Sequence, residues 1–112
     1  MTPLSITVTD HQTCSVITLA GELDRLSADR LRQVIDRSVG RGRTRLIVDV
    51  AELTFCDSVG MWVLLEGHHH AVAVGGWLRL AFVHGTLKRI LRIIGTIRAH
   101  PSPSDLVVIM ER

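Results

Sequence analysis

The chain has no tyrosine, a single lysine and only two cysteines among its 112 residues. Cys14 and Cys56 lack the close spacing of a metal site, and no secretion signal precedes them, so we expect both to be reduced thiols. No segment approaches the ~18 unbroken apolar residues that a membrane-spanning helix needs. These absences argue against a disulfide scaffold, a secreted protein and a membrane protein, and they predict a cytoplasmic location.

The remaining composition is that of an ordinary globular domain. Apolar residues make up 46% of the chain and charged residues 21%, which allows a buried core without disorder. The length predicts one domain over residues 1–112. A net charge of +2 is too small to indicate a nucleic-acid partner.

The first part of the chain predicts a hairpin and a helix. Residues 5–9 and 14–19 alternate as two antiparallel strands, and Gly21 is expected to end the second. Ser27 is the expected N-cap of the helix, which Gly40 and Gly42 stop. Leu26 and Leu31 occupy the two positions of a hydrophobic staple.

The rest of the chain alternates predicted strands and helices. The apolar run at 46–48 is typical of a strand over 45–50 that is buried on both faces, and a strand, a helix and a strand in succession indicate a parallel pair. The further expected elements are a helix over 58–74, a strand over 77–83, a helix from a Thr86 cap to Gly95, and a short strand over 97–100. Residues 105–110 are compatible with a short helix or a closing strand. The expected fold class is α/β, a small mixed β-sheet packed against helices in the order ββαβαβα.

Ser58 stands where the chain passes from strand to helix. Either Asp57 or Ser58 is expected to be the N-cap. A hydroxyl here is exposed, and a phosphate on it would meet free N–H groups and the positive end of the helix dipole. We expect Asp24 and Asp49, each placed at the end of a strand, to gather at the same edge of the sheet and make the neighbourhood acidic.

Enzyme and metal chemistry are not supported by the motifs. The serine lacks the glycine two residues before it that a nucleophile elbow requires, and no histidine has a reason to lie against it. His68, His69 and His70 splay about 100° apart on a helix, so they cannot converge on one ion. We therefore predict a non-enzymatic protein with no cofactor and no metal.

Three stretches together resemble the STAS family, and within it the bacterial anti-sigma factor antagonists. They are residues 21–24, 27–31 and 53–61, and the resemblance extends over about 5–100. It implies that Ser58 is the phosphoacceptor, with Asp24 and Asp57 as its acidic neighbours.

The resemblance also implies a mechanism, partner switching in transcription regulation. The unphosphorylated form would bind an anti-sigma factor, usually a serine kinase of the histidine-kinase-like ATPase type, and so free a sigma factor. Phosphorylation of Ser58 would weaken the complex, and a PP2C-type phosphatase would reset it. The protein itself would be a monomer or a weak homodimer.

The chain departs from the family pattern beside the serine. Val59 and Met61 replace the usual serine and leucine, and Trp62 replaces a small residue. Trp62 is expected to be exposed on the same helix face as Ser58 and to anchor a partner. The predicted partner-binding residues are Asp24, Ser27, Asp57, Val59, Gly60 and Trp62.

Two other functions remain open from the sequence. One keeps the fold and makes the protein a STAS subunit of a lipid-transport or other signalling complex. The other makes it a small-ligand sensor that uses the cleft at the strand ends.

Overall fold

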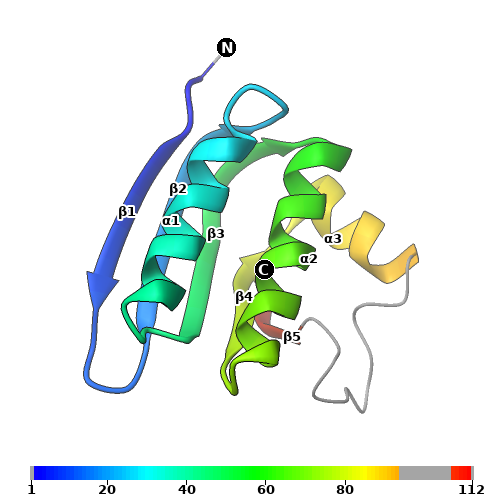
Figure 1. The fold of residues 1–112 in the computed structure, drawn as a ribbon. Coiled ribbons are helices and arrows are strands. Elements are labelled where there is room, and N and C mark those ends of the chain that lie inside the picture. Colours follow the sequence, from blue (N-terminus) through cyan, green and yellow to red (C-terminus); the bar gives the residue numbers. More distant parts are fainter. Residues whose placement is uncertain (1, 94–106, 112) are drawn as a thin grey trace.

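A five-stranded sheet forms the centre of the protein, in the computed structural model that describes residues 2–93 and 107–111 (Figure 1). The sheet order follows the chain, β1-β2-β3-β4-β5. Its strands are β1 (Ser5–Asp10), β2 (Ser15–Leu23), β3 (Arg45–Cys56), β4 (Trp77–Val83) and β5 (Val107–Glu111). The helices are α1 (Ala28–Gly40), α2 (Ser58–Ala73) and α3 (Gly85–Ile93).

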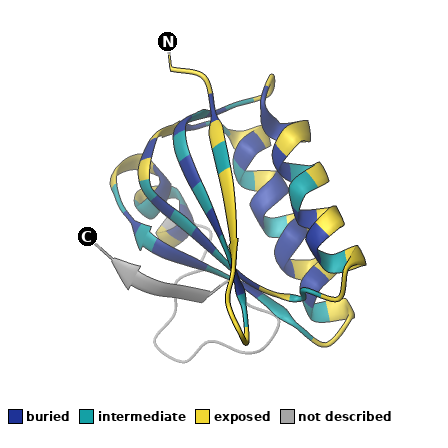
Figure 2. Cartoon of the chain, turned by 90° about the vertical axis from the view of Figure 1, so that its left-hand side faces the viewer, coloured by how far each residue is buried: buried dark blue, intermediate teal, exposed yellow. Residues whose placement is uncertain are grey.

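The sheet is mixed, as the sequence predicts. β1 and β2 form the antiparallel hairpin, and the other neighbouring pairs are parallel. α1 and α2 lie side by side over one face, and α3 lies apart from them beyond the end of β4 (Figures 1 and 2). The sequence of residues 105–110 is compatible with a short helix or a closing strand, and β5 shows that a strand forms there. The strand predicted over 97–100 lies outside the described residues.

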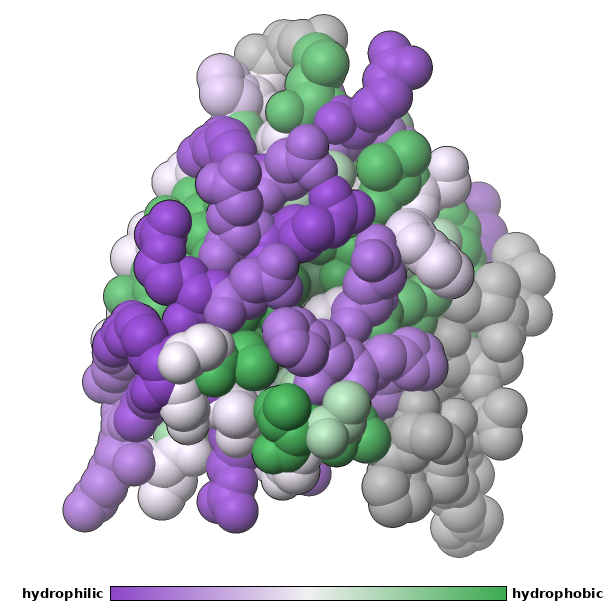
Figure 3. Space-filling model, viewed as in Figure 1, coloured by the Kyte–Doolittle hydropathy of each residue, from purple (hydrophilic) through white to green (hydrophobic). Residues whose placement is uncertain are grey.

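Burial alternates along the strands because α1 and α2 together cover one side of the sheet. β2 is buried at every second residue, and in β3 Leu46 and Val48 are buried while Ile47 is half-buried (Figure 2). The prediction that β3 is buried on both faces is therefore wrong. Hydrophilic side chains dominate the outward surface of α1 and α2 (Figure 3).

Two strands run further than predicted. β2 continues through Gly21 to Leu23, and β3 continues past residue 50 to Cys56. The parallel register shifts on both sides of this glycine, which has φ +97°, so the strand bends there without ending. A Cβ on Gly21 would lie 2.4 Å from the carbonyl oxygen of Pro3, so only glycine lets the N-terminal segment approach β2 this closely.

The third helix also begins earlier than predicted. α3 starts at Gly85, and the Lys88 amide donates to the carbonyl oxygen of His84. Thr86 therefore lies inside the first turn and is not the cap. The predicted end at Gly95 lies outside the described residues.

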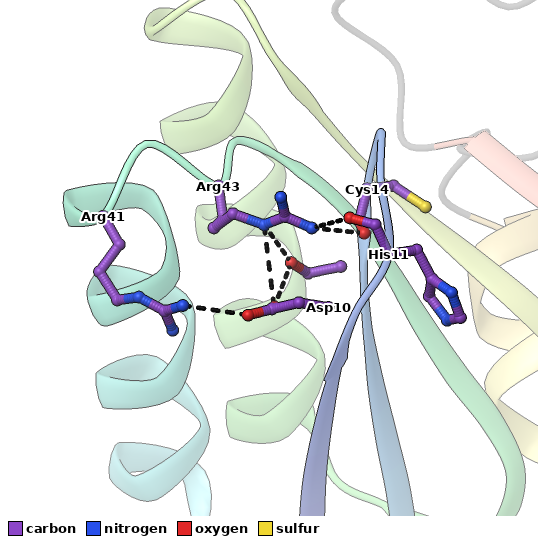
Figure 4. A network of polar contacts seen from close by, with 6 residues as sticks. Asp10, His11, Cys14, Arg41 and Arg43 are labelled. Carbon is purple, nitrogen blue, oxygen red and sulfur yellow. Dashed lines mark hydrogen bonds and ion pairs between the residues drawn. The ribbon is translucent and has the colours of Figure 1, made fainter.

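Arg43 ties the hairpin turn to the start of β3 (Figure 4). Its guanidinium donates to the carbonyl oxygens of His11 and Cys14 and, 2.9 Å away, to the hydroxyl of Ser15. The Cys14 carbonyl oxygen also accepts from the His11 amide across the turn, so the guanidinium adds to the turn's own hydrogen bond. The β1–β2 turn and the start of β3 are thereby joined at the end of the molecule opposite the start of α2 (Figure 1).

Asp10 completes this network. Its carboxylate accepts a hydrogen bond of 2.7 Å from Ser15 and an ion-paired one of 3.0 Å from Arg41. The Ser15 hydrogen bond, with a smaller contribution from the Arg41 one, lowers the pKa of Asp10 below its ordinary value of 3.8.

The depressed pKa of Asp10 predicts an acid-sensitive contribution to stability. Such a group stabilises the fold at pH values above its unfolded pKa, and the contribution is lost as the pH falls through the lower folded pKa. In urea unfolding, Asp10→Asn should therefore be less stable than the wild type at pH 6, and the difference should shrink below pH ~3.8. A difference of equal size at both pH values would contradict this.

Candidate functional site

Ser58 is the first residue of α2 and is exposed. The N-cap is Asp57, whose backbone is extended and whose Oδ1 accepts from the Gly60 amide at 2.8 Å. The capping duty therefore falls on the aspartate. The serine hydroxyl stays at the surface of the first helical turn.

Asp57 also joins α2 to the connection between β2 and α1. Its second oxygen, Oδ2, accepts from the Arg25 amide at 3.0 Å, and its own amide donates to the carbonyl oxygen of Leu23 at 3.1 Å. One carboxylate thus holds two segments that are far apart in the sequence. The surface beside Ser58 is built from both.

The loop at 24–27 is shaped by Asp24. Its Oδ1 accepts from the Leu26 amide, the Ser27 amide and the Ser27 hydroxyl at 3.0–3.1 Å. Ser27 is the N-cap of α1, as predicted, although its hydroxyl caps no helical amide. The staple with Leu31 is also absent because Leu26 turns outward and is 80% exposed.

The predicted partner-binding residues fall into two groups. Ser27 is 8% exposed, and Gly60 is buried. A Cβ on Gly60 would lie 2.6 Å from Cγ of Leu23, so glycine allows α2 to start directly on the end of β2. Val59 and Trp62 are 39% and 61% exposed and project from the helix.

Asp49 does not belong to this site. It lies inside β3, level with Thr18 of β2 and Ala81 of β4, and its Oδ1 accepts from the Ala51 amide at 2.9 Å. The prediction that Asp49 ends its strand is wrong because β3 continues to Cys56. Of the predicted acidic neighbours, Asp57 directly precedes Ser58, and Asp24 lies in the loop whose Arg25 amide donates to Asp57.

Two exposed apolar residues at this end were missed. Leu26 and Phe55 are 80% and 50% exposed. The sequence indicates these two residues only weakly. Leu26 is a single large apolar side chain in a polar turn, and Phe55 lies in a strand, where apolar residues are usual. Phe55 lines a cavity of about 210 Å³ together with Leu53, His84 and Leu87.

Cys56 at the end of β3 is not a reactive thiol. Burial, with a smaller contribution from the neighbouring Asp57 charge, raises the pKa of Cys56 to about 12. The thiol therefore stays protonated at neutral pH, as expected for a core cysteine.

The three consecutive histidines diverge. His68 is 2% exposed and packs inward, whereas His69 and His70 are exposed, and Nδ1 of His70 lies 3.3 Å from Asp36. Within residues 2–93 and 107–111, no group of three or more potential ligands could hold a metal ion. Nor does a helix in that part of the chain have the length and apolarity to cross a membrane.

A comparison with models of known protein families identifies the family of this chain. The model described as "Mlab, STAS domain" matches residues 6–101. The chain belongs to the STAS domain family. Its matching curated relatives include the anti-sigma-F factor antagonist RsfB of Mycobacterium tuberculosis, 33% identical over 54% of this chain, and the anti-sigma F factor antagonist of Paenibacillus polymyxa, 26% identical over 88%. The matches cover 50% of the first protein and 85% of the second, so the chain spans only half the length of RsfB.

Solved structures share this STAS fold. An anti-sigma factor antagonist from Mycobacterium paratuberculosis superposes with a TM-score of 0.74 at 25% identity, over 83% of this chain and 79% of that one. SpoIIAA in its unphosphorylated form has a TM-score of 0.70 at 25% identity, over 80% and 83%. The phosphorylated form of SpoIIAA has a TM-score of 0.71 at 26% identity, over 81% and 84%.

Measurements of unfolding free energy can test whether Asp57, and not Ser58, caps α2. Asp57→Ala should lower the free energy of unfolding by about 1–2 kcal/mol because it removes the cap of α2. Ser58→Ala, the adjacent matched control, should change it by less than about 0.5 kcal/mol because that side chain is exposed. Urea unfolding measures both, and an equal loss in the two variants would contradict the assignment.

Proposed function

We propose that this STAS domain is an anti-sigma factor antagonist switched at Ser58. The unphosphorylated form binds an anti-sigma factor and releases a sigma factor, and phosphorylation weakens that binding. The observation that carries the proposal is the exposed hydroxyl of Ser58 on the first turn of α2, beside a capping aspartate. The relatives named above as anti-sigma factor antagonists support it.

The chemistry at Ser58 suits a protein that is the substrate of a kinase and is not itself an enzyme. The serine Oγ would attack the γ-phosphorus of ATP, ADP would leave, and the hydroxyl proton would pass to a base on the kinase. Both oxygens of Asp57 already accept backbone N–H bonds, so the site itself supplies the acceptor and the kinase supplies the base. The start of α2 then favours the added negative charge.

The predicted partner-binding residues take two roles in this proposal. Val59 and Trp62 touch the anti-sigma factor. Asp24, Ser27, Asp57 and Gly60 hold the surface in shape. The partner is a serine kinase of the histidine-kinase-like ATPase type, a PP2C-type phosphatase removes the phosphate, and the antagonist acts as a monomer or a weak homodimer.

Phosphorylation can be measured directly. Incubation with a panel of purified kinase-type anti-sigma factors from the same genome and ATP should add the mass of one phosphate to the wild type. Ser58→Ala should gain none. A phosphate on the alanine variant, or stable association with a membrane transport ATPase and none of the panel, would contradict the proposal.

The role of Trp62 can be measured by binding. Trp62→Ala should weaken the unphosphorylated complex by about 2 kcal/mol, since an exposed tryptophan is a frequent hot spot. Its melting temperature should stay close to that of the wild type because the side chain is 61% exposed. Unchanged affinity in a titration with the factor that phosphorylates Ser58 would refute this role.

A further inference from the structure

We infer that an apolar rim around Ser58 supplies the affinity for the anti-sigma factor, and that phosphate weakens the complex because it would have to lose its water beneath an apolar partner surface. The apolar rim consists of Leu26, Phe55, Val59 and Trp62. The inference rests on the proposed function. It concerns how the same site is regulated.

The rim stands out from the rest of the described surface. Its four residues are between 39% and 80% exposed. Among residues 2–92, for which burial is described, six large hydrophobic residues are exposed, and only Val8 and Val74 lie outside the rim. Exposed apolar side chains gathered at one place mark interaction sites, whereas scattered ones do not.

The rim residues come from three segments that meet near the start of α2. Val59 follows Ser58, and Trp62 stands one helical turn further on the same face. Phe55 comes from the end of β3, just before the helix. Leu26 is brought in by the hydrogen bond between the Arg25 amide and Asp57, at the end of the molecule where β2 passes into α1 (Figure 1).

Hollows lie beside three of the rim residues. Leu26 lines one of about 280 Å³ with Pro3 and Leu4, and Phe55 lines the cavity of about 210 Å³ near α3. Trp62 lines a third, of about 340 Å³, with Leu65. Projecting apolar residues next to hollows fit an apolar partner surface whose own side chains enter them.

The carboxylates of the loop before α1 and of the α2 cap are engaged by hydrogen bonds within the domain. The Asp24 and Asp57 carboxylates accept hydrogen bonds from within the loop and the helix. The exposed Arg25 directly follows Asp24 in the same loop. Asp49 lies within the sheet. The N-terminus of α2 favours a negative group.

Desolvation and repulsion differ in their response to salt. Covering a phosphate with apolar surface costs its hydration, a local term that ionic strength barely changes. Repulsion between exposed charges is screened, because the Debye length falls from ~10 Å at 0.1 M salt to ~3 Å at 1 M. The ratio of the two dissociation constants, phosphorylated over unphosphorylated, therefore separates the two causes.

The experiment uses the full chain and the purified anti-sigma factor that phosphorylates Ser58. Both forms of the chain are titrated with this factor in about 0.1 M and about 1 M NaCl, with ADP in place of ATP so that no phosphate is transferred. Phosphorylation should weaken binding at least about tenfold, and the ratio should change less than about twofold between the two salt concentrations.

Apolar variants test the rim itself. Leu26→Ser and Phe55→Ser should each weaken the unphosphorylated complex about tenfold, with melting temperatures near that of the wild type. Val74→Ser is the matched control, because Val74 is 51% exposed at the far end of α2. Its affinity should stay within about twofold of the wild type.

The outcomes separate this inference from the proposed function. If no factor of the panel binds the unphosphorylated chain, the proposed function is overturned. If a factor binds but the ratio falls about tenfold at high salt, repulsion is the cause and the inference is overturned while the function stands. Wild-type affinity in both rim variants overturns the inference as well.

Discussion

The carboxylate of Asp57 is the contact on which this end of the molecule depends. One oxygen caps α2 at the Gly60 amide, and the other receives the Arg25 amide from the connection between β2 and α1. Because both oxygens are engaged, the helix start and the loop form one surface. Ser58 stands on that surface with no capping duty of its own, so it is exposed and still fixed in position.

The two ends of the sheet serve different purposes. At the far end, Arg43 and Asp10 satisfy the hairpin turn and close the domain with side chains. Near Ser58, the carboxylates of Asp24 and Asp57 accept from backbone amides, and the exposed side chains include the four large apolar ones of the rim. Because Ser58 is exposed and caps no helical amide, a surface change there need not disturb the core.

A switch of this kind needs no refolding. A phosphate at the start of a helix is compatible with the helix dipole and its free N–H groups. What it changes is the solvation of a surface that a partner has to cover. Under the proposed function, the exchange of partners requires no change of fold, and the apolar rim sets how tightly the partner is held.

The sequence by itself determined the alternation of strands and helices, the position of Ser58 at a helix start and the exposure of Trp62, because these follow from local periodicity and turn chemistry. Only the tertiary structure decided that Asp57 is the cap, that Asp24 holds Ser27 in a turn, that Asp49 lies away from the site, and that Leu26 and Phe55 face solvent. These facts depend on contacts such as that of Arg25 with Asp57, between segments distant in the chain, and on how far two parallel strands continue side by side. Local patterns in a sequence carry no information about either.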